Sequence, residues 1–262
     1  MNSKNTIGKK TTLLNTHYVE RIPKGSTLIL TGAIHAVWGE RLDPVVRLND
    51  QLCALRRWLS VEGLDQIIYV DAGGCTVPEH VINDFNPHGR DYTCFSVDYS
   101  ELARLYEGGR AEAESINHVL EQMPEITRFY KCTGRYFIDN FQNLQQFVAE
   151  QPDAEHVVRT MPERRVSPRW IDTRVFYMTR SAWMTNIAPR ISELTSYSRR
   201  GEVIEGLFYS CFEPNPSFTK TKPVIIGYAG SVGWMWDGDF TPEEKQFAQD
   251  LIVKYGISTF IP

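Results

Sequence analysis

The sequence predicts an α/β protein with a single domain, in which helices flank a mostly parallel central sheet. Short apolar segments typical of buried strands alternate along the chain with longer segments whose apolar residues recur at helical spacing. Glycine or aspartate follows several strand segments, as is typical of loops at the carboxyl end of a parallel strand. The 262 residues, 42 % hydrophobic and 23 % charged, suit one large domain.

The first half of the chain carries a regular alternation. We expect strands at residues 26–31, 66–71 and 92–97, and a short helix at 76–85. Between the first two strands, Asp43 is a helix N-cap and Pro44 suits the first helical position. Apolar residues then recur at helical spacing until Gly63, which predicts a helix over most of this segment.

The alternation continues to the end of the chain. The pattern predicts strands at 126–132, 156–161, 173–178 and 223–228, and helices at 110–122, 138–149, 203–212 and 241–255. The last helix opens with a capping box, Thr241-Pro-Glu-Glu244, and stops at Gly256. Residues 1–22 are polar and aperiodic, so we expect a loose arm there, followed by one domain over 23–262.

Composition excludes several function classes. With 28 basic and 32 acidic side chains the net charge is −4, which argues against general nucleic-acid binding. Five scattered cysteines without a CxxC pair argue against a disulfide scaffold and a cysteine-based zinc site. The sequence has no apolar run of about 20 residues and no signal-peptide core at its start, so we expect a cytoplasmic protein.

Candidate site residues follow the predicted strands, because ligands of open α/β sheets gather at the carboxyl ends of strands. Each group taken alone is also compatible with a turn or a helix cap. The groups are Thr31-Gly32, Asp71-Ala-Gly-Gly74, Asp98, Lys131-Cys-Thr-Gly-Arg-Tyr136 and the glycine-rich segment 227–233.

The segment 131–136 is the most informative of these groups. A strand delivers Lys131, and the turn at Gly134 then brings Arg135 and Tyr136 toward the same strand end. Two cations beside a closely approachable backbone suit a phosphate or diphosphate, which Arg can bind in a bidentate manner. The alternative is that Arg135 pairs with a structural carboxylate, such as Asp139 or Glu205.

The Lys-x-Thr-Gly-Arg-Tyr block, followed by Asn140, resembles a group of bacterial GT-A-like glycosyltransferases. These enzymes build capsule, O-antigen, lipopolysaccharide or other surface polysaccharides from nucleotide sugars. Gly108-Gly-Arg-Ala-Glu112 before a helix, Asp172-Thr-Arg174 and Val203-Ile-Glu205 agree with the resemblance, which covers about residues 100–235. It implies a single GT-A-like (Rossmann-like) domain, with a donor-nucleotide half over about 23–140 and an acceptor half over about 141–262.

The resemblance implies transfer of a sugar from a nucleotide sugar to a saccharide or lipid-linked saccharide acceptor. Glu205 is the preferred general base, since apolar Ile204 and Leu207 beside it would partly bury it and raise its pKa. Asp172 is the second choice for the base, and Arg174 and Tyr209 are candidates for acceptor binding. The donor-binding candidates are Thr31, Gly32, Asp71, Arg110, Lys131, Thr133, Gly134, Arg135 and Tyr136.

The sequence departs from metal-dependent enzymes of this kind. No Asp-x-Asp follows a mid-chain strand, and Lys131 and Arg135 take the matching position, so we expect neither Mg²⁺ nor Mn²⁺ as a cofactor. The only Asp-x-Asp, Asp237-Gly-Asp239, is expected to be a loop and cap, with a metal site as the alternative. The six histidines show no paired metal spacing.

Two other function classes stay open. Val70-Asp-Ala-Gly-Gly74 with Asp98 after the next strand would suit a Rossmann-type methyltransferase using S-adenosylmethionine. A non-catalytic nucleotide- or carbohydrate-binding protein would need the same cations but no base. The basic loop with Arg164, Arg165 and Arg169 would allow peripheral contact with anionic lipid at the inner face of the membrane. The sugar, its nucleotide and the acceptor are not predicted.

Overall fold

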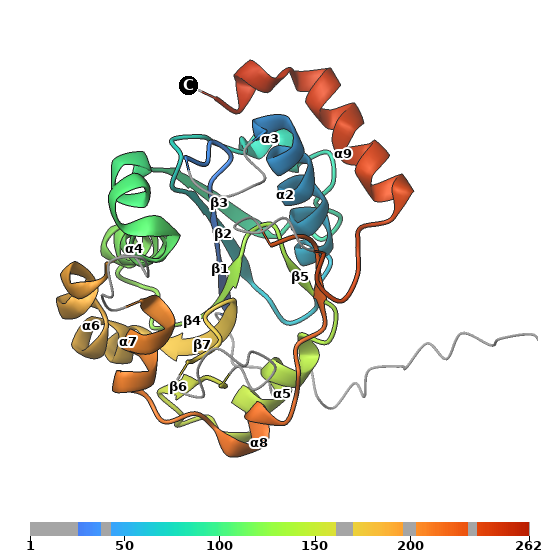
Figure 1. The fold of residues 1–262 in the computed structure, drawn as a ribbon. Coiled ribbons are helices and arrows are strands. Elements are labelled where there is room, and N and C mark those ends of the chain that lie inside the picture. The colour runs from blue at the N-terminus through green and yellow to red at the C-terminus, as the bar shows by residue number, and fades with distance from the viewer. Residues whose placement is uncertain (1–25, 38–42, 161–169, 196–202, 230–234, 262) are drawn as a thin grey trace, which may run out of the picture.

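The computed structural model describes residues 26–37, 43–160, 170–195, 203–229 and 235–261 (Figure 1). A six-stranded sheet in the order β3-β2-β1-β4-β7-β6 runs through their middle. The arm predicted for residues 1–22 and the basic loop with Arg164, Arg165 and Arg169 lie outside the described residues. The strands of this sheet are β1 (Thr27–Gly32), β2 (Gln66–Asp71), β3 (Asp91–Ser96), β4 (Arg128–Thr133), β6 (His156–Val157) and β7 (Val175–Thr179).

The predicted fold class is confirmed, because the central sheet is mostly parallel and flanked by helices. β3, β2, β1 and β4 pair in parallel, β7 runs antiparallel to β4, and β6 runs antiparallel to β7. The reversal at β7 matters for the site, since it brings the start of β7 beside the end of β4. The backbone N–H of Thr133 accordingly donates to the carbonyl of Arg174 at 3.1 Å.

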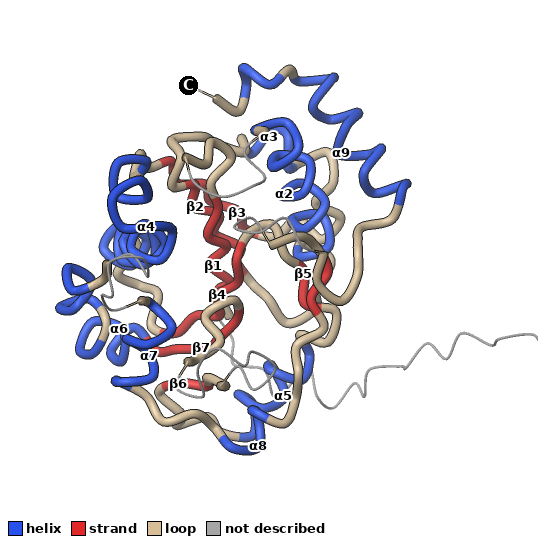
Figure 2. Tube along the Cα trace, viewed as in Figure 1, coloured by secondary structure: helices blue, strands red, loops and turns tan. Residues whose placement is uncertain are grey.

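Helices cover both faces of the sheet, and the strands supply a core to each face (Figures 1 and 2). Ile29, Ile68 and Phe129 are buried in one core, whereas their neighbours Leu28 and Tyr130 are buried in the other. This alternation follows from the two-residue period of a strand and explains why both sides of the central strands are apolar.

The first of these cores is covered by α4 (Ser100–Gln122), α6 (Arg180–Asn186), η1 (Ala188–Glu193) and α7 (Ile204–Cys211). The elements on the other side are α2 (Pro44–Trp58), α3 (Glu79–Ile82), α5 (Gln142–Glu150), α8 (Pro216–Thr219), α9 (Pro242–Tyr255) and η3 (Ile257–Thr259). None of the helices in the described residues has both the length and the apolar composition that crossing a membrane requires.

The helix starts predicted from capping residues are confirmed. The side chain of Asp43 accepts hydrogen bonds from the backbone N–H groups of Val45 and Val46 at the start of α2. At the start of α9, Thr241 and Glu244 form both bonds of the capping box. These features are local in sequence, so they need no knowledge of the rest of the fold.

The strand predicted for 223–228 is shorter and lies elsewhere. β8 (Ile225–Ile226) pairs with β5 (Phe137–Ile138) in a separate two-stranded sheet, and does not join the main sheet. Because Phe137 and Ile138 are used in this pairing, the helix predicted from residue 138 begins only at Gln142. The short elements α6, η1 and α8 were not predicted.

The sequence pattern places Gly108 and Gly109 before the helix predicted at 110–122, and this is wrong: both glycines lie inside α4, which begins ten residues earlier than expected. Packing explains a glycine there. A Cβ atom on Gly109 would lie 3.1 Å from Cγ2 of Ile204, the first residue of α7. Gly109 therefore lets α7 approach α4, and this contact outweighs the low helix propensity of glycine.

Candidate active site

A pocket of about 390 Å³ opens at the carboxyl ends of β1 and β4, as the sequence predicts for this fold class. The ends of these strands and the residues leading into β7 form its floor, while α4 and the start of α7 supply walls. Its charged lining residues are Arg47, Arg110, Arg135 and Arg174 with Glu112 and Glu205, so the described lining carries a positive net charge.

The structure brings most of the predicted site residues to this pocket. Those that line it are Thr31, Gly32, Arg110, Thr133, Arg135, Tyr136, Arg174 and Glu205. Five others lie outside the lining, and three of them, Asp71, Lys131 and Asp172, are almost completely buried. The remaining two are Gly134, whose N–H donates to the carbonyl of Thr31 at 2.6 Å, and Tyr209, which is exposed on α7.

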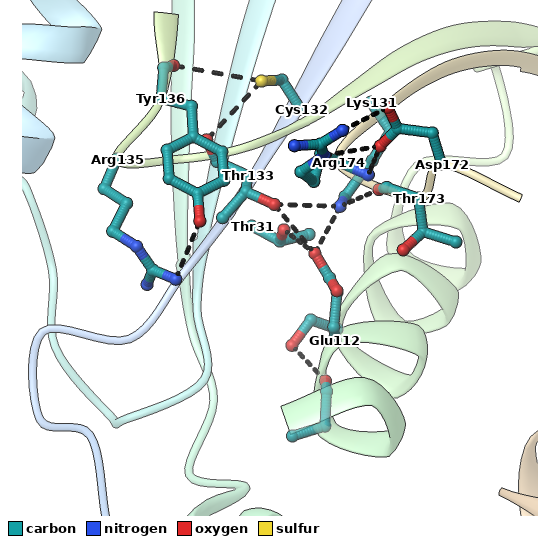
Figure 3. Close-up of polar contacts among 12 residues, drawn as sticks. Thr31, Glu112, Lys131, Cys132, Thr133, Arg135, Tyr136, Asp172, Thr173 and Arg174 are labelled. Atoms are coloured by element: carbon teal, nitrogen blue, oxygen red, sulfur yellow. Dashed lines mark hydrogen bonds and ion pairs between the residues drawn. The ribbon is translucent and has the colours of Figure 1, made fainter. Parts of the chain in front are cut away.

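Lys131 lies beneath the pocket floor, in an ion pair with Glu112 of α4 (Figure 3). Its side chain is only 1 % exposed, and its Nζ also donates to the carbonyl of Thr173 at 2.7 Å and to Oγ1 of Thr133 at 3.3 Å. The ammonium group is therefore already compensated by protein oxygens. Figure 3 shows Lys131 turned toward Glu112 and Thr173, whereas Arg135 extends to the hydroxyl of Tyr136.

Asp172 is fully buried between two arginines at the start of β7. It forms ion pairs with Arg159 at 3.1 Å and with Arg174 at 2.7 Å, and Arg174 also donates from Nε at 2.7 Å. Burial alone would raise the pKa of Asp172, but the two guanidinium groups hold it below its ordinary value. A carboxylate that is both buried and bound in this way fixes the backbone leading into β7, and it is poorly suited to take a proton from a substrate.

Asp71, at the end of β2, also bonds to the protein around it. Its carboxylate accepts hydrogen bonds from the backbone N–H groups of Ile34, Gly73 and Cys75 at 2.8 to 3.1 Å. Burial raises its pKa, although these bonds act in the opposite direction. Asp71 thus shapes the loops after β1 and β2, and Asp98 similarly caps the start of α4 through the N–H of Ser100.

Arg135 differs from the buried cations, because it forms no ion pair with any carboxylate of the described residues. Its Nε donates to the carbonyl of Tyr228 at 3.0 Å, and its Nη2 donates to the hydroxyl of Tyr136 at 3.4 Å. The alternative that Arg135 pairs with Asp139 or Glu205 is not supported by these contacts. Its guanidinium group is held by neutral oxygens and keeps donors for a ligand.

Arg47, on α2, adds a second positive charge near Arg135. Its Nε donates to the carbonyl of Ala33 at 2.5 Å, and only 4 % of the residue is exposed. Burial, with a contribution from the charge of Arg135, lowers the pKa of Arg47 to about 10. An anionic ligand bound between Arg47 and Arg135 would be stabilised by both positive charges.

Arg110, on α4, is a third arginine of the pocket. Its Nε is buried and has no hydrogen-bond partner among the described residues, and its guanidinium group stacks on the ring of Tyr106 at 4.4 Å. Across the pocket lining, Arg174 stacks on Trp236 in the same way at 4.5 Å. The pocket therefore combines guanidinium groups with flat aromatic surfaces.

Glu205 lies in the first turn of α7 and lines the pocket, so it is placed where a general base would reach a ligand. Its neighbours Ile204 and Leu207 are buried, as the apolar flanks predict. The choice between Glu205 and Asp172 is thus informed by geometry, since only Glu205 faces the pocket.

Some pocket residues were missed by sequence reasoning, chiefly Arg47, Glu112 and Trp236. A signal existed for Arg47, because it precedes Gln51, Leu55 and Trp58 at spacings of four, four and three along one face of α2 and so continues a buried stripe. Glu112 lies in the helix predicted at 110–122, but nothing local in the sequence indicates that its side chain contacts Thr31 and Lys131.

The Asp237-Gly-Asp239 segment has protein partners for both carboxylates. Asp237 pairs with Lys222 and accepts from the N–H of Ile225, and Asp239 pairs with Lys245. Within the described ranges, no group of three or more His, Cys, Asp or Glu side chains is arranged to hold a metal ion. Metal independence of the reaction stays a prediction.

Comparison with known proteins gives structural neighbours only. No protein-family profile matches the sequence, and no curated protein does. Similar solved structures include an inositol-1-phosphate CTP transferase from T. maritima, with 12 % identity, a TM-score of 0.38 and coverage of 88 % of this chain and 97 % of that one. A 4-diphosphocytidyl-2C-methyl-D-erythritol synthase from Anaerococcus prevotii has 14 % identity and a TM-score of 0.40, with coverage of 88 % of this chain and 99 % of that one.

A third neighbour is a glycosyltransferase involved in the glycosylation of the major capsid of PBCV-1, with 11 % identity and a TM-score of 0.39, covering 86 % of this chain and 99 % of that one. At this level of similarity the neighbours identify no activity for this chain.

Proposed function

We propose that the protein is a glycosyltransferase whose pocket at the ends of β1 and β4 binds a nucleotide sugar. The observation that carries this proposal is the group of arginines in the pocket lining, of which Arg110 and Arg135 form no ion pair with a described carboxylate. A diphosphate supplies the negative charge that such a group lacks, and guanidinium groups match its oxygens. The resemblance of residues 131–136 to glycosyltransferases of surface polysaccharide synthesis gives the proposal its reaction class.

In this proposal, Arg135, with Arg47 and Arg110 nearby, stabilises the charge of the leaving nucleoside diphosphate as its bond to the sugar breaks. Glu205 accepts the proton of the acceptor hydroxyl as that oxygen attacks the sugar carbon. The acceptor is a saccharide or a lipid-linked saccharide, and the reaction serves polysaccharide synthesis on the cytoplasmic side of the membrane. No metal ion is needed to bind the donor.

The methyltransferase alternative is weakened by the position of the residues that suggested it. Asp71 is buried in bonds to backbone N–H groups, and Asp98 caps α4, so neither lines the pocket. A methyltransferase would need one of these two carboxylates in the pocket to bind the ribose of its cofactor. A non-catalytic binding protein remains a clear alternative, and turnover distinguishes it from an enzyme.

The decisive experiment follows products. The purified protein is incubated with UDP-, GDP- and CMP-linked sugars, with and without oligosaccharide and lipid-linked acceptors, and in a separate arm with nucleoside triphosphates and sugar 1-phosphates. Released nucleotides and pyrophosphate are quantified. We expect release of the nucleotide at a rate that the correct acceptor increases. Pyrophosphate formation from a nucleoside triphosphate and a sugar phosphate would indicate nucleotidyl transfer instead, and tight binding without any turnover would indicate a binding protein.

Glu205→Gln then tests the proposed base. Nucleotide-sugar binding should stay within about twofold, whereas turnover should fall by roughly 10²–10⁴, the range typical of a lost general base. Glu213→Gln, an exposed carboxylate just after α7, is the matched control and should leave both unchanged. Full turnover by Glu205→Gln would remove Glu205 from the mechanism.

A further inference from the structure

The pocket lining contains a carboxylate that was not predicted as a site residue, Glu112 of α4 (Figure 3). One of its oxygens, Oε1, accepts a hydrogen bond from Oγ1 of Thr31 at 2.7 Å and a longer one from Oγ1 of Thr133 at 3.4 Å. The same oxygen contacts the ammonium group of Lys131. Three donors from two strands therefore fix the carboxylate at the ends of β1 and β4.

The other oxygen of Glu112, Oε2, makes no hydrogen bond or ion pair with a described residue. The side chain is 21 % exposed and lines the pocket, so this oxygen is accessible to a ligand. A carboxylate held through one oxygen, with its second oxygen open to a pocket, is pre-organised to accept a hydrogen bond.

The charge of Glu112 restricts which part of a ligand can lie against it. A carboxylate repels phosphate oxygens and accepts hydrogen bonds from hydroxyl groups. The pocket arginines provide the opposite environment, which suits phosphates. An anionic ligand with a hydroxylated ring would therefore turn its phosphates toward the arginines and a ring hydroxyl toward Glu112.

We propose that Oε2 of Glu112 accepts a hydrogen bond from a ring hydroxyl of the bound nucleotide sugar, and that the pocket thereby selects hydroxylated over deoxygenated ligands. This inference rests on the proposed function and specifies its ligand. The hydroxyl belongs either to the ribose of the nucleotide or to the transferred sugar. Lys131 and Thr31 act as positioning residues for the carboxylate.

Isothermal titration with matched ligand pairs tests the inference and separates the two sources. One arm compares UDP, CDP and GDP with their 2′-deoxy and 3′-deoxy counterparts, and the other compares UDP-glucose with UDP-2-deoxyglucose. In the wild-type protein, loss of the recognised hydroxyl in one arm should weaken binding by roughly 10-fold or more, as expected for a hydrogen bond to a charged group.

Variants connect that preference to Glu112. Glu112→Gln should reduce the preference to about threefold or less, because a neutral amide replaces the charged acceptor. Glu114→Gln, two residues further along α4 and outside the pocket lining, should keep the full preference. The double variant Glu112→Leu with Lys131→Met removes both buried partners together, so a loss of preference in it cannot be attributed to an unpaired lysine.

The outcomes separate this inference from the proposed function. Suppose that nucleotides bind and that Arg135→Lys weakens their binding. If the wild-type protein then binds deoxy and hydroxylated ligands equally, or if Glu112→Gln keeps the preference, the inference is wrong while the proposed function stands. If no nucleotide or nucleotide sugar binds the wild-type protein, both are wrong.

Discussion

Two sets of cationic side chains lie near the end of β4 and the start of β7, and they differ in how their charge is compensated. Lys131, Arg159 and Arg174 are ion-paired with Glu112 or Asp172, and Lys131 and Arg159 are each only 1 % exposed. Arg110 and Arg135 line the pocket without an ion pair to any described carboxylate. The first set stabilises the folded protein through buried ion pairs. The second set has charge available for a ligand.

The contrast between the two sets shows why residue type alone does not identify a binding site. All of these side chains are cations, and from residue type alone any of them could be assigned to a phosphate. A buried, paired cation contributes to folding, since removing its partner leaves a charge without compensation. A pocket cation without an ion pair contributes to ligand binding. Variants in the two sets should therefore fail in different assays.

The largest effect on stability is expected from Asp172→Asn. It leaves Arg159 and Arg174 without their buried carboxylate, which typically costs about 3–5 kcal/mol of unfolding free energy. Urea unfolding followed by circular dichroism measures this loss. Asp250→Asn, at an exposed position on α9, makes the same chemical change and should alter stability by less than about 0.5 kcal/mol. Equal effects of the two changes would contradict a structural role of the Asp172 cluster.

Arg135→Lys should show the opposite pattern. It keeps the charge but loses the bidentate geometry, so binding of a nucleoside diphosphate should weaken by about 1.5–3 kcal/mol while the unfolding free energy changes by less than about 1 kcal/mol. Titration calorimetry and urea unfolding measure the two quantities. Arg128→Lys, at the opposite end of β4, is the matched control for binding. A destabilised variant with normal nucleotide affinity would make the Thr-Gly-Arg-Tyr segment a structural turn only.

Of the two sets of cations, only the ion-paired set has a partner carboxylate that acid can protonate. The pKa of Asp172 is held below its ordinary value, so its contribution to stability is present above the unfolded-state pKa of about 3.9 and is lost as the pH falls through the folded-state pKa. The difference in unfolding free energy between wild type and Asp172→Asn should accordingly be smaller at pH 3 than at pH 6. A difference that stays constant over this range would mean that Asp172 is not stabilised as an ion.

Asp71 provides the internal contrast, because burial raises its pKa instead. Its charged form is disfavoured by folding, so its contribution to stability decreases as the pH rises from the unfolded-state pKa through the folded-state pKa. Stability curves of Asp71→Asn and Asp172→Asn, each taken relative to wild type, should therefore slope in opposite directions in the acidic range.

The smallest expected effect concerns the glycines of α4. A methyl group added at Gly108 would have no atom of the described residues within 4 Å apart from the adjoining helix backbone, so Gly108→Ala should raise the unfolding free energy by about 0.5–1 kcal/mol through helix propensity. Gly109→Ala should gain less or lose stability, because its methyl group would meet Ile204 at 3.1 Å. Thermal unfolding of the pair measures the difference. Destabilisation by Gly108→Ala would argue against a helix at this position.

The sequence predicted those parts of the fold that depend on local chemistry. The starts of α2 and α9 follow from Asp43 and from Thr241 with Glu244, which act within one helical turn. The central strands follow from their apolar runs. The helix at Gly108 and Gly109 was not predictable in this way, since the reason for a glycine there is the approach of Ile204, about 95 residues later in the chain.

The sequence predicted the location of the candidate site better than it predicted which residues line it. The rule that ligands bind beyond strand ends selected Arg135 and Thr133, which do line the pocket. It could not separate Arg135 from Lys131, because the partner of Lys131 is Glu112 on α4, and no local signal pairs the two residues. The antiparallel direction of β7, which brings Asp172 and Arg174 to the end of β4, also has no local signal.

The central claim is that the accessible arginines of the pocket bind the phosphates of a nucleotide. Titration calorimetry of the wild-type protein with UDP, CDP and GDP, and with uridine, cytidine and guanosine, in buffer containing EDTA, tests it most directly. We expect one diphosphate to bind at least about 100-fold more tightly than its nucleoside, with an affinity that falls as salt rises. Equal binding of nucleoside and diphosphate, or diphosphate binding that appears only when Mn²⁺ replaces EDTA, would contradict it.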